Sequence, residues 1–239
     1  MQAANRLQKA LKAGAPAFGA WQMLPGTNLT RTICRSAPNI DWLLVDLEHG
    51  NVSDDGMHEI IAAAAACGAS PIVRVAEGQH WMIKRTLDAG AHGIMVPMIE
   101  TVDDARRVVE YSKFPPRGKR GFEPLLVVDK FVSTGANGKI RQLAGVEYLQ
   151  QADEGCALEN VDAIAAIDGI DVLFIGPLIS GLRSRAVDAI LRVYRTGRRN
   201  GKAVGVYCDT GEQGKTVVTD MVGLKKVVRG EFEVAGGVQ

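Results

Sequence analysis

The chain has 239 residues, of which 46% are hydrophobic and 23% are charged, and its formal net charge is +1. This length suits a single domain spanning residues 1–239, because α/β barrels commonly take about 250 residues as one unit. The near-neutral charge gives no electrostatic case for binding nucleic acid or an anionic membrane, and no stretch approaches the roughly 18 continuous apolar residues of a membrane span.

Strand-like and helix-like segments alternate along the first half of the chain. Apolar runs between turn residues predict strands, and helical periodicity that ends at a glycine or begins at a capping residue predicts helices. In chain order we expect a helix at 4–13, a strand at 16–23, a helix at 30–36, a strand at 42–47, a helix at 56–67, a strand at 71–75, a helix at 80–88, a strand at 93–98 and a helix from 103 to about 111.

The second half begins with a rigid loop rich in proline and glycine, FPPRGKRGFE, whose Arg117, Lys119 and Arg120 could hold an anion. The basic side chains further on, around 192–202, are typical of a solvated helix face. After the loop we expect a short strand at 125–128, helices at 140–152 and 158–167, a strand at 171–176, a helix at 187–199, strands at 202–207 and 215–220, and a closing helix at 224–235.

This alternation implies parallel strands joined by right-handed crossovers. Eight predicted strands favour a (β/α)8 TIM-type barrel over a doubly wound sheet. The sequence has no GxGxxG after its first strand and no GxxxxGK[ST] loop, so a nucleotide-binding protein loses its main support.

The cysteines and the N-terminus bear on the cellular compartment. Four cysteines lie far apart in the sequence without the spacing of a metal site, which indicates reduced thiols; they are Cys34, Cys67, Cys156 and Cys208. Residues 1–14 are amphipathic and lack the apolar core of a secretory signal. We therefore expect a cytoplasmic protein.

The segment DWLLVDLEHG, at 41–50, carries the first candidate functional residues. An apolar strand breaks into Asp46, Glu48 and His49. Ionisable groups at the end of a buried strand are costly unless they are paired or used, and barrel active sites are built at the carboxyl ends of strands. His49 is therefore a candidate for proton transfer; the alternative is a histidine hydrogen-bonded at a strand–loop junction.

Other polar or aromatic residues follow predicted strands: Trp21 in PAFGAWQM, Arg74 in PIVRV and Glu100 after GIMVPM. An arginine at a strand end can bind a carboxylate with two hydrogen bonds, and a nearby histidine can move a proton. The pair suits a small oxo acid whose carbonyl must be enolised. The alternative for Arg74 is a salt bridge to Glu48 or Glu77, and for Glu100 a salt bridge within its loop.

Several segments, in order, resemble the HpcH/HpaI aldolase family, the class II pyruvate-type aldolases that include 4-hydroxy-2-oxoheptanedioate aldolase and macrophomate synthase. They are WLLVDLEHG, PIVRV, TLDAGAHGIMVPMIET, PPRGKRGF, EYLQQA and ALENVDAIAAIDGIDVLFIGP. The resemblance is good over residues 15–177. It implies a TIM-type barrel that binds Mg2+ or Mn2+ and forms or cleaves a carbon–carbon bond next to a pyruvate enolate.

The resemblance also implies roles for single residues. His49 matches the catalytic base, and Asp88 in TLDAG matches the acid that raises the basicity of that histidine. Arg74 matches the arginine that binds the oxo acid and stabilises its enolate. These roles fit general chemistry, because a guanidinium can hold developing negative charge while an imidazole moves the proton.

Further positions follow from the same resemblance. Trp21, Gly176 and Pro177 match residues at the substrate site. Asp46 and Glu48 are expected beside His49, where they help to hold a metal-bound water.

The chain departs from the family at its two metal carboxylates. The family's glutamate-bearing strand precedes the ALENVDAIAAIDG helix, where this chain has only DEGCA at 153–157. The family's aspartate follows the Gly-Pro of DVLFIGP, where this chain has LIS at 178–180, and leucine and isoleucine cannot ligate a hard cation. Glu48, Glu154 and Glu159 are substitute candidates; the alternative for the last two is surface charge at a helix N-terminus.

A missing strand would leave the barrel gapped around the fifth to sixth strand, with two unpaired edges, unless residues 125–128 fill the gap. Two functions therefore stay open. The first is an aldolase acting on a 4-hydroxy-2-oxo acid or a related small oxo acid. The second is a catalytically silent barrel that holds a ligand or forms an oligomer. In either case the resemblance predicts a homo-oligomer.

Overall fold

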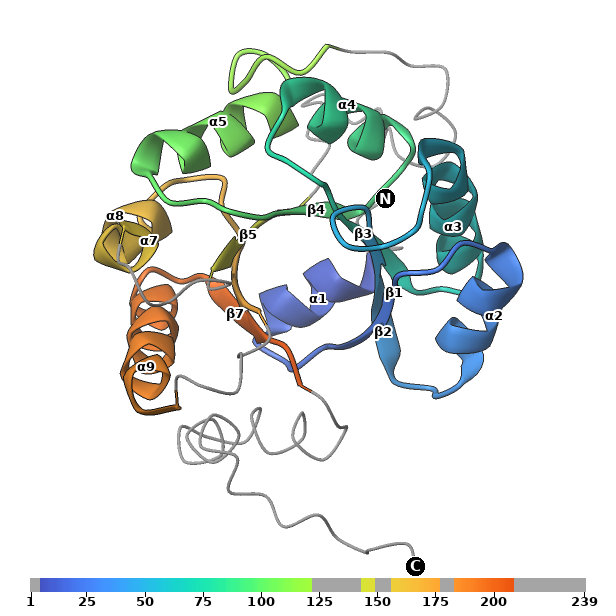
Figure 1. The fold of residues 1–239 in the computed structure, drawn as a ribbon, viewed down its shortest axis with the longest axis horizontal. Coiled ribbons are helices and arrows are strands. Elements are labelled where there is room, and N and C mark those ends of the chain that lie inside the picture. Colours follow the sequence, from blue (N-terminus) through green and yellow to red (C-terminus); the bar gives the residue numbers. More distant parts are fainter. Residues whose placement is uncertain (1–4, 122–142, 149–155, 177–182, 209–239) are drawn as a thin grey trace, which may run out of the picture.

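The computed structural model describes residues 5–121, 143–148, 156–176 and 183–208. Within them, seven strands form one parallel sheet in the order β1-β2-β3-β4-β5-β6-β7, and most helices surround it (Figure 1). The strands are β1 (Phe18–Gln22), β2 (Ile40–Asp46), β3 (Ser70–Arg74), β4 (Gly93–Val96), β5 (Leu143–Tyr148), β6 (Val172–Ile175) and β7 (Ala203–Val206). The helices are α1 (Arg6–Ala13), α2 (Thr27–Arg35), α3 (Asp54–Ala66), α4 (His80–Asp88), α5 (Val102–Ser112), α7 (Cys156–Glu159), α8 (Val161–Ala165) and α9 (Arg183–Arg199).

The predicted alternation of strands and helices is confirmed from α1 to α5, with boundaries shifted by a few residues. Local chemistry explains the ends of α3: the hydroxyl of Ser53 accepts a hydrogen bond from the backbone of Gly56, and Gly68 beyond the helix has a left-handed φ of 82°. Thr101 and Asp104 form a capping box at the start of α5. Among the described helices, none has the length and apolar character needed to cross a membrane.

The segment predicted as a helix at 140–152 contains β5 instead. Met95 of β4 pairs with Gly145, and Glu147 pairs with Phe174 of β6. The periodicity of a short apolar run does not separate strand from helix, and here the backbone edges of β4 and β6 need a partner. The described sheet is therefore continuous from β1 to β7, and the gap expected around the fifth to sixth strand does not occur there.

Two other expectations about the second half need correction. The helix predicted at 158–167 is divided into α7 and α8, and α9 begins before residue 187. The strands expected at 125–128 and 215–220 and the helix at 224–235 lie outside the described residues.

Alternate residues of each strand face the barrel interior and the surrounding helices. The interior cluster consists of Leu44, Ile72, Met95 and Phe174, with Trp21, Trp42, Tyr207 and Leu7 packed against it. The outward-facing Leu43 and Val45 pack in a second cluster with Met57 and Ile60 of α3. Because strand residues alternate, Asp46 has the same inward orientation as Leu44.

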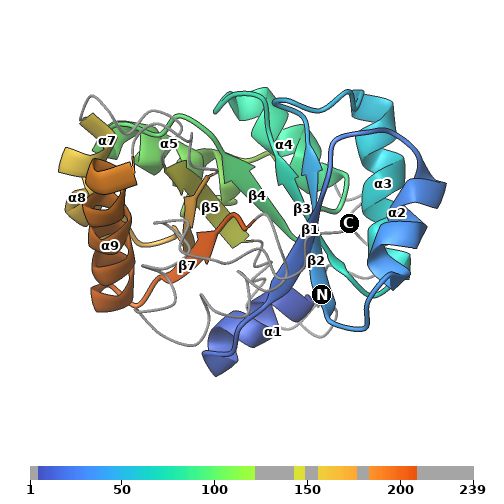
Figure 2. The same ribbon diagram turned by 60° about the horizontal axis from the view of Figure 1, so that its bottom comes forward.

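Helix α1 closes the end of the barrel where the strands begin (Figures 1 and 2). The buried side chain of Asn5 donates to the carbonyl of His92 at 3.3 Å and accepts from the hydroxyl of Ser70 at 3.2 Å. The backbone N–H of Leu7 also donates to that hydroxyl, at 3.2 Å. The carboxyl ends of the strands are therefore the end left for a functional site.

Asp88 lies at the same amino-terminal end, because α4 runs opposite to the strands and Asp88 is its last residue. Its carboxylate accepts hydrogen bonds from Arg120 at 2.7 Å and from Lys84 at 2.8 Å. Arg120 is 1% exposed, and its guanidinium lies 4.6 Å from the ring centroid of Phe114. Lys119 of the same loop pairs with Glu110, so two of the three basic residues expected to hold an anion have partners within the chain.

We expect Asp88→Asn to lower the free energy of unfolding by about 3 kcal/mol, because removing one partner leaves the other buried charge uncompensated. Denaturant unfolding followed by circular dichroism measures this change. The matched control is Asp103→Asn, which breaks an exposed pair with Arg106 and should have little effect. Equal, small changes in the two variants would show that the Asp88–Arg120 pair is dispensable.

Stability should also depend on pH through His92, which is 1% exposed. Burial lowers the pKa of His92 to about 4 from 6.5. Between pH 6.5 and pH 4, His92 is therefore protonated in the unfolded chain and neutral in the folded chain. The free energy of unfolding consequently falls by about 3 kcal/mol as the pH is lowered from 6.5 toward 4. Urea unfolding across this range should show the loss in the wild type and a smaller slope in His92→Asn. The variant His58→Asn, at a partly exposed position of α3, should keep the wild-type slope; a wild-type slope in His92→Asn would contradict the prediction.

Candidate active site at the carboxyl ends of the strands

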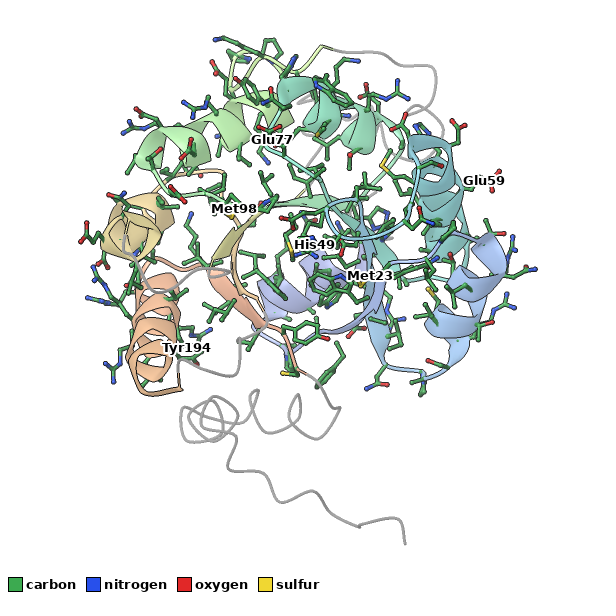
Figure 3. All side chains as sticks on the ribbon, in the orientation of Figure 1. Met23, His49, Glu59, Glu77, Met98 and Tyr194 are labelled. Atoms are coloured by element: carbon green, nitrogen blue, oxygen red, sulfur yellow. The ribbon has the colours of Figure 1, made fainter. Side chains whose placement is uncertain are left out.

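The carboxyl ends of the first three strands bring together Trp21, Asp46 and Arg74. Asp46 is the last residue of β2, and it pairs in register with Arg74, the last residue of β3. Glu48 and His49 follow in the turn after β2. In Figure 3, His49 lies over the middle of the strand ring. The two candidate residues His49 and Arg74 thus lie on the same rim, as predicted from the sequence.

Asp46 is the common acceptor of this group. It is fully buried, and its Oδ1 accepts hydrogen bonds from Arg74 Nε at 3.0 Å and from the backbone N–H groups of Glu48 and His49 at 3.0 and 3.2 Å. Its Oδ2 accepts from Arg74 Nη2 at 2.6 Å and from Trp21 Nε1 at 3.1 Å. Both oxygens of one carboxylate therefore connect two strands, a turn and an aromatic ring.

These contacts keep Asp46 ionised. Burial alone would raise the pKa of Asp46, but hydrogen bonds from Arg74 and Trp21, with the positive charge of Arg74, hold it below its usual value. Arg74 consequently faces a full negative charge at neutral pH.

Arg74 is held from three directions. Asp46 binds the Nε and Nη2 edge, and Glu48 Oε2 lies 3.0 Å from Nη1. The indole of Trp21 lies against the guanidinium, with 4.9 Å between the guanidinium carbon and the ring centroid. The salt bridge to Glu48 named as an alternative is present, and it coexists with a position at the rim. The bidentate pair with Asp46 was not predicted.

His49 is the accessible member of the group, with 49% of its side chain exposed. Its Nε2 lies 3.8 Å from Glu48 Oε2, and its backbone N–H donates to Asp46. In the view of Figure 3, the exposed residues Met23 and Met98 are labelled on either side of His49. The imidazole is therefore accessible to a molecule at the barrel mouth. The backbone of His49 is hydrogen-bonded at the strand–loop junction, which is where the alternative interpretation placed this residue.

Asp88 does not join this group. Among the described residues it bonds to Arg120 and Lys84 at the amino-terminal end of the barrel, whereas His49 lies at the carboxyl end. Within the part of this single chain that the structure describes, therefore, no contact joins Asp88 to His49, and the role that the resemblance implies for Asp88 stays a prediction. The topology explains the separation, because the helix that bears Asp88 ends at the opposite end of the sheet from the turn that bears His49.

The remaining candidates are scattered. Gly176 directly follows β6 at the rim, and Pro177 and Glu154 lie outside the described residues. Glu159 is exposed on α7, and the exposed Glu100 uses its backbone carbonyl to accept from Asn160. Of the acidic residues considered as metal ligands, Glu48 is the one that the described residues place in contact with Arg74 and beside His49.

A divalent ion does not fit the described side chains alone. Among them, no group of three or more His, Cys, Asp or Glu residues is placed to hold a metal. The carboxylate of Asp46 is bound to Arg74 and Trp21, and Glu48 contacts Arg74. Hard cations prefer several oxygen ligands, so Glu48 by itself is an incomplete site.

Comparison with known proteins places the chain among aldolases. The family model described as HpcH/HpaI aldolase/citrate lyase matches residues 23–179. A hydroxypyruvate/pyruvate aldolase of Agrobacterium fabrum is 37% identical over an aligned segment that covers 72% of this chain and 64% of that relative. A 2-dehydro-3,6-dideoxy-6-sulfogluconate aldolase of Pseudomonas putida is 31% identical over 88% of this chain and 89% of its own length.

A solved structure agrees with these matches. The crystal structure of an HpcH/HpaI aldolase/citrate lyase family protein from Burkholderia cenocepacia superposes with a TM-score of 0.77 at 28% identity, covering 88% of this chain and 87% of the other. The similarity confirms the α/β TIM-type fold. This chain belongs to the HpcH/HpaI aldolase/citrate lyase family.

Proposed function

We propose that this protein is an aldolase that cleaves or forms the carbon–carbon bond next to the enolate of pyruvate, with a 4-hydroxy-2-oxo acid or a related small oxo acid as substrate. The observation that supports this most is the placement of the buried, oriented guanidinium of Arg74 on the same rim as the exposed imidazole of His49. The names of the Agrobacterium and Pseudomonas relatives, both aldolases, support the same reaction class.

The reaction needs one proton acceptor and one group that holds negative charge. In the cleavage direction a base takes the proton of the C4 hydroxyl, the C3–C4 bond breaks, and its electron pair forms the enolate of pyruvate while the aldehyde leaves. Protonation of the enolate at C3 completes pyruvate. We assign the proton transfers to His49, which is exposed at the mouth, and the enolate oxygen to Arg74, whose charge and fixed geometry suit an oxyanion.

Arg74 and His49 should therefore both be needed for proton exchange at C3 of pyruvate. We expect Arg74→Lys to slow the exchange into heavy water by about 100-fold or more, because a lysine cannot reproduce the two-point geometry. His49→Gln should slow it by a similar order. Proton NMR of the pyruvate methyl signal measures the rate. The matched controls are Arg85→Lys, at an exposed arginine that pairs with Asp54, and His58→Gln; both should keep the wild-type rate.

We further propose that activity requires Mg2+ or Mn2+. Asp46, Glu48 and Arg74 together carry a charge of −1, and an oxo acid is itself an anion, so the mouth needs added positive charge to bind it. Chelation with EDTA should abolish proton exchange, and adding Mn2+ should restore it. Relaxation of water protons by Mn2+ gives a binding measurement that does not depend on activity. Full exchange in chelated protein would contradict the proposal.

The second candidate function is a catalytically silent barrel, which is favoured by the incomplete ligand set among the described side chains. The two functions differ in one measurement. A silent barrel would show no pyruvate proton exchange at high protein concentration with saturating Mn2+, and an aldolase would show exchange that His49→Gln removes.

Family membership also underlies our proposal of a cytoplasmic homo-oligomer. Light scattering after size-exclusion chromatography should give a mass that is an integral multiple, greater than one, of the chain mass.

A further inference from the structure

We propose that Asp46 is the positioning residue of this site: it sets the plane of the Arg74 guanidinium, the place of the Trp21 ring and the turn that presents Glu48 and His49. This role rests on the proposed aldolase function, because it concerns how that site is assembled. Asp46 itself does not touch the substrate in this proposal, since it is fully buried behind Arg74.

The first support is the geometry of the pair with Arg74. Asp46 takes the edge of the guanidinium formed by Nε and Nη2, at 3.0 and 2.6 Å. Two parallel bonds fix both the direction and the plane of a guanidinium, which a single bond would leave free to rotate. With Nε and Nη2 directed at Asp46, the remaining nitrogen of Arg74, Nη1, faces Glu48 at 3.0 Å.

The second support is the aromatic ring. Trp21 donates its indole N–H to Asp46 Oδ2, and the same ring lies against the guanidinium of Arg74. Trp21 in turn contacts Phe174 and Tyr207, with ring centroids 5.8 and 5.6 Å apart. Asp46 therefore fixes both the indole of Trp21 and the guanidinium of Arg74, so that one carboxylate determines how these two groups stack.

The third support is the turn after β2. Asp46 Oδ1 accepts the backbone N–H groups of Glu48 and His49, which folds the chain back over its own carboxylate. The turn is closed tightly: a Cβ atom at Gly50 would collide with the backbone carbonyl oxygen of Asp46. A side-chain acceptor at 46 and a glycine at 50 together explain why the imidazole of His49 emerges at the mouth.

Asparagine at position 46 tests this role with almost no change of shape. The amide would lack the negative charge and would place N–H donors against at least one of the donors that now bind Asp46. We expect Asp46→Asn to lower kcat for aldol cleavage, and the rate of pyruvate proton exchange, by at least about 100-fold, and to weaken binding of oxalate, an analogue of the enolate, by at least about 10-fold. The matched control is Asp41→Asn on the same strand, where the carboxylate pairs with Arg6 at the other end of the barrel and should leave all three unchanged.

A spectroscopic measurement separates positioning from general stability. The 15N–1H signal of Arg74 Nε, assigned by its absence in Arg74→Lys, should shift and exchange faster with solvent in Asp46→Asn while circular dichroism still reports the folded barrel. Wild-type proton exchange and oxalate affinity in folded Asp46→Asn, or an unchanged Nε signal, would overturn the proposal. If Asp46→Asn does not fold, the wild-type protein gives the test. Its Arg74 Nε–H proton should exchange with solvent at least 100-fold more slowly than the Nε–H proton of the exposed Arg85, and equally fast exchange would overturn the positioning role.

The same signal distinguishes failure of the function from failure of this inference. A wild-type protein that is inactive with Mn2+ would refute the aldolase, and a shifted Nε signal in Asp46→Asn would still support the positioning role. If the wild type is active and Asp46→Asn keeps the wild-type proton exchange rate and oxalate affinity, the positioning role is refuted and the proposed aldolase function is still supported.

Discussion

The buried ion pair between Asp46 and Arg74 is the interaction on which the functional end of this barrel depends. Taking two charges out of water costs several kcal/mol per ion, and their attraction offsets that cost only when the geometry is good and the remaining lone pairs are satisfied. Both conditions hold here. The strands place the two residues side by side in register, and three further donors complete the carboxylate, from the indole of Trp21 and the backbone of Glu48 and His49. The register of the sheet thus brings Asp46 and Arg74 together, and Asp46 in turn fixes the side chain of Trp21 and the turn that bears Glu48 and His49.

The two ends of the barrel use buried charge differently. At the amino-terminal end, Arg120 and Asp88 form a pair beneath the aromatic ring of Phe114, and α1 closes the interior through Asn5 and Ser70. This charge joins a loop to a helix and is covered by protein. At the carboxyl end, Glu48 and His49 leave charge and a proton-accepting ring next to solvent. The division follows the general rule for such barrels, in which one end supports stability and the other carries the chemistry.

The parts of this molecule that could be predicted from sequence are those governed by local patterns. The strands from β1 to β4 were expected because each is an apolar run ending at turn residues, and α3 was expected from its serine cap and glycine stop. β5 was missed because a segment of six residues has too short a pattern to separate strand from helix, and what makes it a strand is the pair of neighbours, β4 and β6, supplied by distant parts of the chain. The site divides in the same way. The positions of His49 and Arg74 follow from strand ends, whereas the five hydrogen bonds of Asp46 and the distance of Asp88 from His49 depend on how the strands and helices are arranged in space.

The charge balance at the mouth explains why arginine alone does not make an oxo-acid site. Arg74 brings one positive charge, but Asp46 and Glu48 bring two negative charges at contact distance, so the three groups repel an anion at longer range. The same carboxylates that orient the guanidinium therefore reduce its attraction for a substrate. Orientation and attraction can be combined only if further positive charge is added at the rim, which is the reason for our proposal that activity requires a divalent cation. Two carboxylates against one guanidinium thus give a site whose shape is fixed by its own ion pairs before any ligand binds.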